Sequence, residues 1–416
     1  MRTLQLMAFA ATLGASFLTP GAAGQTRFAT LYTFKGQPDG YMPNGVTGGD
    51  GALYGTTALG GASGNGTVFE LQPPAAPDGA WTETPLYSFT CQNGDGCGGT
   101  AVPAAGAGGV LYGTTAGGGA ASSGTVFRLQ PPASLGGAWT EQVLYSFTGQ
   151  NALTGDGWDP NTKLVIGSGG TLYGTTLLGG AHNYGTVFAL EPPAATGEAW
   201  TETLLYSFPD KDSAPQGLAL SDTGLLYGTT MAGGNSRAGT VYQLSPPASP
   251  GGAWTHTTLY SFAGGADGCG PSGPPVISSD GSLYGATFGT FVFGEVQAHG
   301  DGTVFQLAPP TVPGGIWTKT ILHRMGKGNG WGPDSPLIVR DGAIYGTAAD
   351  LNGGMVYRLQ KPVTPGDPWT LTTLHRFGYY IVPGGGLAMD KSGAIFGTTS
   401  TLTILPIPGT VYRVTP

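Results

Sequence analysis

A short string recurs through almost the whole chain and restricts the fold more than any other feature. Leu53-Tyr54-Gly55-Thr56-Thr57 returns with small changes about every 57 residues, at Leu111, Leu172, Leu226, Leu283, Ile344 and Ile395. Self-similarity at this period is typical of propellers and solenoids, in which each repeat is one supersecondary unit. The chain must therefore build its core by packing similar units against one another.

Three further segments recur in each unit. A short apolar segment (such as 217–220) precedes the first string, a Gly-Thr-Val-Phe string follows it from Gly66, and a segment from Trp81 leads to Leu-Tyr-Ser-Phe at Leu86. These segments are rich in β-branched and aromatic residues and are bounded by Gly, Pro or Asp-Gly, which predicts short strands and tight turns. We name the four strands A (apolar segment), B (Leu-Tyr-Gly-Thr-Thr), C (Gly-Thr-Val-Phe) and D (Trp to Phe).

The order of the strands predicts how the units close on one another. A single D segment at 28–34 stands before the first complete unit, and the seventh unit consists of A, B and C alone. We therefore predict an all-β, seven-bladed β-propeller with four antiparallel strands per blade. Pairing of the N-terminal strand with the last three strands would close the ring and leave no open sheet edge. A parallel β-helix is the structural alternative, but it gives no reason for ends of this kind.

The first 24 residues form a separate segment. Arg2 is followed by an apolar stretch at 4–18 and by the small residues Ala22, Ala23 and Gly24, a pattern typical of a secretory signal peptide. We expect residues 1–24 to be a signal peptide and residues 25–416 to be the exported propeller, extracellular or periplasmic. No other stretch reaches the ~20 apolar residues of a spanning helix, so no transmembrane segment is expected.

The repeated strings resemble a known family. Leu-Tyr-Gly-Thr-Thr, Gly-Gly, Gly-Thr-Val-Phe and Leu-Tyr-Ser-Phe in this order resemble the GloVer tandem repeat of exported bacterial proteins, over 28–414. The resemblance implies export and a repeat fold but no biochemical activity. The layout, with Gly60-Gly61 and its equivalents before an aromatic strand, a turn and Trp, also resembles kelch propellers. Kelch propellers include both protein-interaction modules and a copper oxidase, so this resemblance does not select a function.

Charge and motif content exclude several function classes. The chain carries 16 Lys and Arg against 24 Asp and Glu, a net charge of −8, and has no basic stripe for nucleic acid. None of its 5 histidines forms a pair with metal-ligand spacing. It has no Gly-x-Ser-x-Gly nucleophile motif. We therefore predict no catalytic residue, no metal and no cofactor.

Differences in loop length between the units locate the predicted binding face. The spacing from the Gly of strand C to the Trp of strand D is constant, whereas the B–C loop is six residues longer in unit five and three residues shorter in unit six than the common length. In a propeller the B–C and D–A loops emerge on the same face, and variable loops commonly carry binding. We predict a shallow groove over unit six formed by Phe288, Phe291, Phe293, Trp331, Asp350, Asn352, Tyr379 and Tyr380. The alternative is that these apolar loops pack on one another as a small hairpin cap.

The D–A loops contain two further features. Asp-Gly recurs at Asp39, Asp95, Asp156 and Asp267, and we interpret it as a turn in which Asp accepts a backbone hydrogen bond; calcium or sugar binding is the alternative. Cys91 and Cys97 bracket one loop, and export favours a disulfide between them, worth about 2.4 kcal/mol by loop entropy. Cys269 aligns with Cys97 without a partner, which predicts a buried thiol or one outside any disulfide.

These observations predict an exported, non-catalytic binding or surface-interaction module that uses the variable-loop face. Its partner would be a polysaccharide or an extracellular protein, and the protein itself would be a monomer. One alternative is a polysaccharide lyase or hydrolase that uses the same face. The other is a purely architectural envelope or matrix protein.

Overall fold

The fold comes from a computed structural model of the chain. It describes residues 26–416 except 49–50, 77–78, 135, 150–154, 196, 210–213, 250, 290, 294–295, 299–301, 313, 327–331, 334–335, 350–352 and 402–407, with the backbone alone at 291–293 and 296–298. The described residues form β-strands and two short 3-10 turns, η1 (Ala107–Gly109) and η2 (Ser168–Gly170), and include no α-helix. The prediction of an all-β protein is confirmed.

We number the units one to seven by their Leu-Tyr-Gly-Thr-Thr copies and keep the strand letters. The A strands are β2 (Gly40–Gly48), β6 (Gly96–Gly99) with β7 (Ala104–Ala105), β11 (Val165–Ile166), β15 (Pro215–Leu220), β19 (Val276–Ile277), β25 (Gly332–Pro333) with β26 (Ile338–Arg340), and β30 (Ile381–Met389). The B strands are β3 (Leu53–Gly60), β8 (Leu111–Gly118), β12 (Leu172–Thr176), β16 (Leu226–Thr230), β20 (Leu283–Thr287), β27 (Ala343–Ala349) and β31 (Ile395–Thr401).

The remaining strands follow the same order. The C strands are β4 (Thr67–Gln72), β9 (Thr125–Gln130), β13 (Thr186–Glu191), β17 (Thr240–Ser245), β23 (Thr303–Ala308), β28 (Met355–Gln360) and β32 (Thr410–Thr415). The D strands are β5 (Thr82–Ser88), β10 (Thr140–Ser146), β14 (Thr201–Ser207), β18 (Thr255–Ser261), β24 (Thr318–Arg324), β29 (Thr370–Arg376) and, for unit seven, β1 (Arg27–Thr33). The B–C loop of unit five adds the pair β21 (Phe291–Phe293) and β22 (Val296–Ala298).

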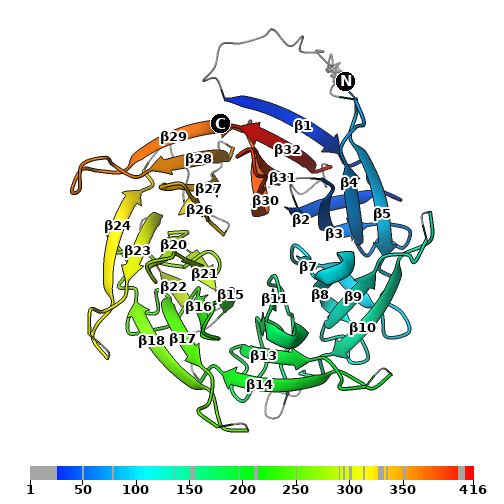
Figure 1. Cartoon of the computed structure of the whole chain (residues 1–416), viewed down its shortest axis with the longest axis horizontal. Helices are drawn as coiled ribbons and strands as arrows, with labels where there is room; N and C mark the ends of the chain where they lie inside the picture. Colours follow the sequence, from blue (N-terminus) through cyan, green and yellow to red (C-terminus); the bar gives the residue numbers. More distant parts are fainter. Residues whose placement is uncertain are drawn as a thin grey trace, which may run out of the picture.

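Each unit forms an antiparallel sheet in the order A-B-C-D. Figure 1 shows these sheets around a common centre, with the A strands innermost and the D strands at the periphery. Because consecutive strands alternate in direction, the D–A and B–C loops lie at one end of the A strands and the A–B and C–D turns at the other. The arrangement is propeller-like, and it gathers seven inner segments from all parts of the sequence about one axis.

The Gly of strand B is required by close packing. In unit one Gly55 lies opposite Phe69 of strand C, and a Cβ atom at Gly55 would overlap the Phe69 ring. The ring is fully buried, and truncating such a core phenylalanine to alanine costs about 3–5 kcal/mol. Only a residue without a side chain lets the aromatic ring lie across the neighbouring strand.

A pair of threonines joins strands B and C. In unit one the hydroxyl oxygens of Thr57 and Thr67 lie 2.9 Å apart, and the Thr67 N–H donates to Thr57 Oγ1 at 3.0 Å. The same hydroxyl contact, at 2.7–2.8 Å, recurs in Thr115/Thr125, Thr176/Thr186, Thr230/Thr240, Thr287/Thr303 and Thr399/Thr410. In unit six the paired residues are Ala348 and Met355. Because a buried hydroxyl needs a partner, a unit that lacks one threonine of the pair is expected to lack the other as well, as unit six does.

Adjacent sheets pack through apolar and aromatic side chains. Between units seven and one, Phe34, Leu53, Phe69 and Phe396 belong to one buried cluster. In units one to five the Trp before strand D contacts the aromatic residue of strand B in the preceding unit. Ring centroids are 6.2–6.3 Å apart in Trp81–Phe396, Trp139–Tyr54, Trp200–Tyr112, Trp254–Tyr173 and Trp317–Tyr227. The constant spacing up to each Trp therefore maintains the contact between units.

The first and last described strands pair with each other. β1 runs antiparallel to β32, from Arg27 opposite Thr415 to Thr33 opposite Thr410. Units seven and one also meet at the centre, where Gly45 pairs in parallel with Gly386. The Thr398 hydroxyl donates to the Pro43 carbonyl at 3.1 Å, a bond between units like that from Thr56 to the Ala101 carbonyl at 3.0 Å.

Candidate functional site

The residues of the predicted groove are only partly described. Phe288 is half-buried after β20, and Phe291 and Phe293 lie in β21, where the backbone alone is described. Trp331, Asp350 and Asn352 lie outside the described residues. Tyr379 and Tyr380 form the turn before β30 and are 73% and 51% exposed. The hairpin of the alternative interpretation is present as β21 and β22, and the groove itself stays a prediction.

The cysteines follow the sequence expectation. Cys91 and Cys97 form a disulfide with their Cα atoms 4.8 Å apart. Cys269 is buried outside any disulfide, with its Sγ atom 2.6 Å from the Gly289 carbonyl oxygen. Equivalent positions in units two and five thus hold a disulfide sulfur and a buried thiol.

The Asp of each Asp-Gly turn accepts the backbone hydrogen bond predicted for it. Asp39 Oδ2 accepts from the Lys35 N–H at 2.8 Å, and Asp95 Oδ2 accepts from the Thr90 N–H at 2.7 Å. Each Asp also receives a Tyr hydroxyl from the preceding D strand, as with Tyr32 to Asp39 Oδ2 at 2.9 Å. The described residues contain no group of three or more His, Cys, Asp or Glu side chains that could hold a metal ion.

A second carboxyl group faces this Asp in units one to three. Burial, and then the negative charge of Asp39, raise the pKa of Glu83 in β5 to about 7. The pKa values of Glu141 beside Asp95 and Glu202 beside Asp156 are raised to about 7 for the same reasons. Sequence reasoning missed this repeated pair, although the string Trp-Thr-Glu at the start of the D strands of units one to three carries its signal.

Unit five has a lysine where units one to three have glutamate. Lys319 Nζ lies 2.7 Å from Asp267 Oδ1, and the Lys319 side chain is only 4% exposed. The ammonium also lies over the Phe262 ring, 4.5 Å from its centroid. Burial acts to raise the pKa of Asp267, but the hydrogen bonds from Lys319 and Ala263 outweigh it and lower that pKa.

The inner strands surround a central cavity of about 610 Å³. Strands or loops of all seven units line it. Five units contribute a neutral polar side chain from strand A or the segment just before it, namely Asn44, Thr100, Asn161, Gln216 and Ser272. Four of these residues follow a proline directly, so the sequence held a signal for the ring of polar residues that our loop comparison did not use.

Lys163 is the single charged residue among the described residues that line the cavity. Its side chain is exposed to the cavity, yet protein surrounds the cavity, and burial lowers its pKa. The described lining contains no carboxylate and no histidine. A cavity with amides, hydroxyls and one amine is suited to binding a hydroxylated ligand.

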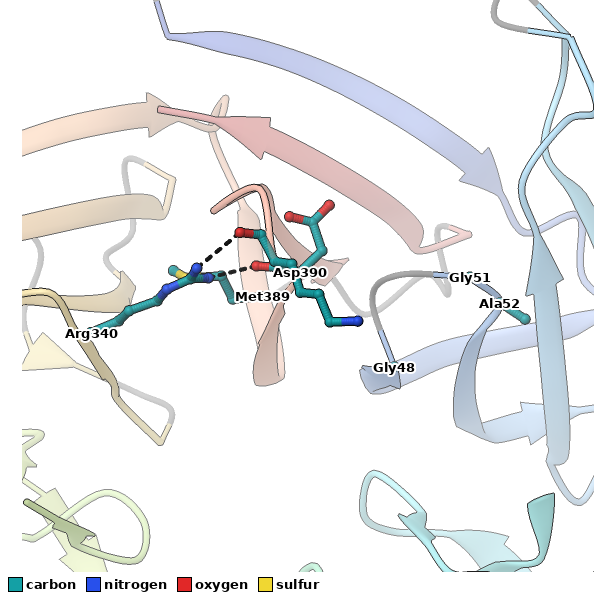
Figure 2. A pocket seen from close by; sticks show the side chains of 7 residues that line it. Gly48, Gly51, Ala52, Arg340, Met389 and Asp390 are labelled. Carbon is teal, nitrogen blue, oxygen red and sulfur yellow. Dashed lines mark hydrogen bonds between the residues drawn. The ribbon is translucent and has the colours of Figure 1, made fainter. Parts of the chain in front are cut away.

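A second hollow, of about 460 Å³, lies among the A–B turns of units six, seven and one. Figure 2 shows Arg340 reaching to the turn at Asp390. The Arg340 guanidinium donates to the carbonyl oxygens of Asp390 at 2.6 Å and Lys391 at 2.9 Å, and its Nε atom lies 3.3 Å from Asp341 Oδ2. Because these contacts occupy the guanidinium, this hollow has less to offer a ligand than the central cavity.

Fold and repeat together define the class of protein: an all-β, propeller-like repeat protein with a central cavity that both apolar and polar side chains line. The chain belongs to the Gloeobacter/Verrucomicrobia repeat family, whose model matches residues 14–154, 77–289 and 214–416. The predicted resemblance to the GloVer-type repeat is confirmed. No curated protein matches the chain. The described residues contain no helix long and apolar enough to cross a membrane.

Several solved structures share the fold at low sequence identity. An ulvan lyase of a new polysaccharide lyase family aligns at 12% identity with a TM-score of 0.58, covering 92% of this chain and 95% of the lyase. The polysaccharide lyase Uly1 aligns at 10% identity with a TM-score of 0.50, covering 95% and 93%. A puromycin-hydrolyzing peptidase of Mycobacterium tuberculosis aligns at 13% identity with a TM-score of 0.51, covering 92% of this chain and 54% of the peptidase. At these identities the likeness shows a common all-β fold.

Proposed function

We propose that this protein is an exported polysaccharide-binding module built as a closed seven-bladed propeller. The seven strand-B copies, the pairing of β1 with β32 and the bond from Thr398 to Pro43 support the closed ring. The Cys91–Cys97 disulfide supports export, since disulfides persist in oxidising compartments. Removal of residues 1–24 as a signal peptide would be checked by N-terminal sequencing of the secreted protein, and its monomeric state by light scattering.

The central cavity is the observation that carries the proposed binding role. Five different units contribute amide or hydroxyl side chains to its lining from strand A or the segment just before it, toward the face of the variable loops. Such groups donate to and accept from sugar hydroxyls without a charge cost. The exposed rings of Tyr379 and Tyr380 precede strand A of unit seven and offer apolar contact on the same face. The predicted groove over unit six would extend this surface.

The ulvan lyase and Uly1 structures add support for a polysaccharide ligand, because both share this fold over most of their length. The described cavity lining has no pair of carboxyl groups of the kind that glycoside hydrolysis uses. Lys163 supports one alternative: with its pKa lowered, its amine could accept a proton in a lyase reaction. A purely architectural role would leave the cavity without a ligand.

The test is a calorimetric screen of the secreted protein against neutral and acidic polysaccharides, with turnover monitored for every glycan that binds. We expect binding without product, weakened roughly fivefold by Gln216→Ala, since a neutral hydrogen bond contributes about 1 kcal/mol. The control is Gln72→Ala, which alters an exposed glutamine on β4 away from the cavity. Formation of an unsaturated product would replace the proposal with the lyase, and absence of all binding would favour the architectural role.

The same screen tests the loop surface. Tyr379→Ala and Trp331→Ala should each weaken binding if the ligand extends from the cavity over units six and seven. An unchanged affinity in both variants, together with a loss in Gln216→Ala, would confine the ligand to the cavity.

A further inference from the structure

The one charged residue in the central cavity has no partner within the described protein. Lys163 makes no hydrogen bond or ion pair with any described residue. The buried Lys319, by contrast, is held by Asp267 at 2.7 Å. Lys163 is exposed to the cavity, but the protein around the cavity disfavours a cation without a counter-charge and lowers the pKa of Lys163. An ammonium group kept in such a place is suited to meet an anion from outside the chain.

Polar atoms without partners occur on the same side of the cavity. The polar residues of units one and two are used for contacts between units: Asn44 donates to the Gly99 carbonyl at 2.6 Å, and Thr100 donates to the Pro160 carbonyl at 3.0 Å. In units three and five, Asn161 Oδ1 and Ser272 Oγ are buried and have no hydrogen-bond partner. Leaving such an atom unpaired costs about 1–3 kcal/mol in folded proteins, so each one calls for a partner from outside the chain, such as a water molecule, an ion or a ligand.

The unpaired cation and the unpaired polar atoms are independent observations, and both belong to the same side of the cavity. Units one and two use their polar residues to hold the ring together, while units three to five present Lys163, Asn161, Gln216 and Ser272 to the cavity. The cation can bind an oxyanion, and the amides and the hydroxyl can bind neighbouring sugar hydroxyls.

We infer that the side of the cavity formed by units three to five binds an acidic sugar, with Lys163 bonded to an oxyanion on the ring and Gln216 bonded to its hydroxyls, joined by Asn161 Oδ1 and Ser272 Oγ after a rotation of these two side chains. The inference rests on the proposed function and narrows its ligand to an acidic polysaccharide. The oxyanion is the carboxylate of a uronate or a sulfate ester, since both present oxygen acceptors with a negative charge. Because the protein carries a net charge of −8, general attraction cannot supply this preference, and the site itself must do so.

The test compares three oligosaccharide probes by calorimetry: oligogalacturonate, its fully methyl-esterified form, and a sulfated galactan oligosaccharide. The protein is used in four forms, the native chain, Lys163→Met, Lys163→Arg and the control Lys361→Met, which removes an exposed lysine after strand C of unit six. Thermal unfolding of each form shows whether it folds. Lys163→Arg keeps the charge and distinguishes loss of the cation from a change in packing.

We expect an acidic probe to bind roughly tenfold to a hundredfold more tightly than the methyl ester, the range of a charge-assisted hydrogen bond. Lys163→Met should abolish that preference, Lys163→Arg should retain most of it, and Lys361→Met should leave it unchanged. Whichever acidic probe loses affinity for the Lys163→Met variant shows whether the oxyanion that Lys163 binds is a carboxylate or a sulfate. As the pH rises, the affinity for this probe should decline before an exposed lysine would lose its charge, because the pKa of Lys163 is lowered.

Two results would overturn the inference in different ways. Equal binding of oligogalacturonate and its ester, unaffected by Lys163→Met, would refute the acidic subsite and leave polysaccharide binding in place. No binding of these probes or of any glycan in the wider screen would refute the proposed function and the subsite with it.

Discussion

Units one to three and units five and six place different side chains in the same two positions of the repeat. At the first position Glu83, Glu141 and Glu202 face an Asp carboxylate, whereas unit five has Lys319 facing Asp267. At the second, a threonine pair joins strands B and C in units one to three, whereas unit six has Ala348 opposite Met355. One backbone therefore accommodates a carboxyl pair or an ion pair, and a hydroxyl pair or an apolar pair.

The difference teaches that the repeated backbone is held by its apolar contacts between sheets, and that the polar pairs adjust to one another locally. In each case both partners are compatible: the glutamate beside aspartate keeps its proton up to about pH 7 and so limits the repulsion, and the ammonium group of the lysine offsets the aspartate charge. Changing one partner alone should be costly, while changing both should cost less.

The largest effect is expected when unit five is given the side chain of units one to three. Lys319→Glu replaces the buried ion pair with two carboxyl groups and should lower the free energy of unfolding at pH 8 by about 3–5 kcal/mol. Denaturant unfolding measures it, and part of the loss should be regained at pH 5, where the new carboxyl group is protonated. Lys361→Glu, at an exposed lysine, is the control and should change stability little. A loss that is the same at both pH values would contradict the interpretation.

A smaller effect is expected when unit three is given the pair of unit six. Thr176→Ala leaves the Thr186 hydroxyl without its 2.7 Å partner and the Leu178 carbonyl without its 2.9 Å donor, and should cost about 2 kcal/mol. The double variant Thr176→Ala/Thr186→Met should be more stable than the sum of the two single losses by about 1 kcal/mol. Additive losses in this double-mutant cycle would show that the two hydroxyls act independently.

The all-β, repeated architecture could be predicted from the sequence because each type of strand recurs in unit after unit. Gly55, Thr57 and Trp81 recur because each meets the same kind of neighbour in most units, and periodicity detects such positions. The Cys91–Cys97 disulfide was predictable because both residues lie in one loop.

The candidate site was harder to predict because its members differ between units. Asn44, Thr100, Asn161, Gln216 and Ser272 share a polar character but no single residue type, so apart from the proline before four of them no repeated string marks them. Lys163 occurs in a single unit, and its significance depends on the cavity that the other units form around it. Differences in loop length predicted a site over units five to seven, whereas the polar residues that line the cavity belong to units one to five.

The smallest effect concerns pH and tests the carboxyl pairs of units one to three directly. Because the pKa of Glu83 is raised from its ordinary 4.5 to about 7, the folded protein binds more protons than the unfolded chain between these values. Its contribution to stability is therefore greatest at low pH and is lost as the pH rises towards 7. Partial contact with water reduces the effect to about 1 kcal/mol for each glutamate.

Urea unfolding at pH 5 and pH 8 should show this loss of stability. Glu83→Gln keeps the size of the side chain and cannot ionise. It should remove about one third of the pH dependence that the triple variant Glu83→Gln/Glu141→Gln/Glu202→Gln removes. An exposed control, Glu198→Gln in the C–D turn of unit three, should not alter the pH dependence. If the triple variant kept the native pH dependence, the three glutamates would be ionised in the folded protein and the equivalence between carboxyl pair and ion pair would fail.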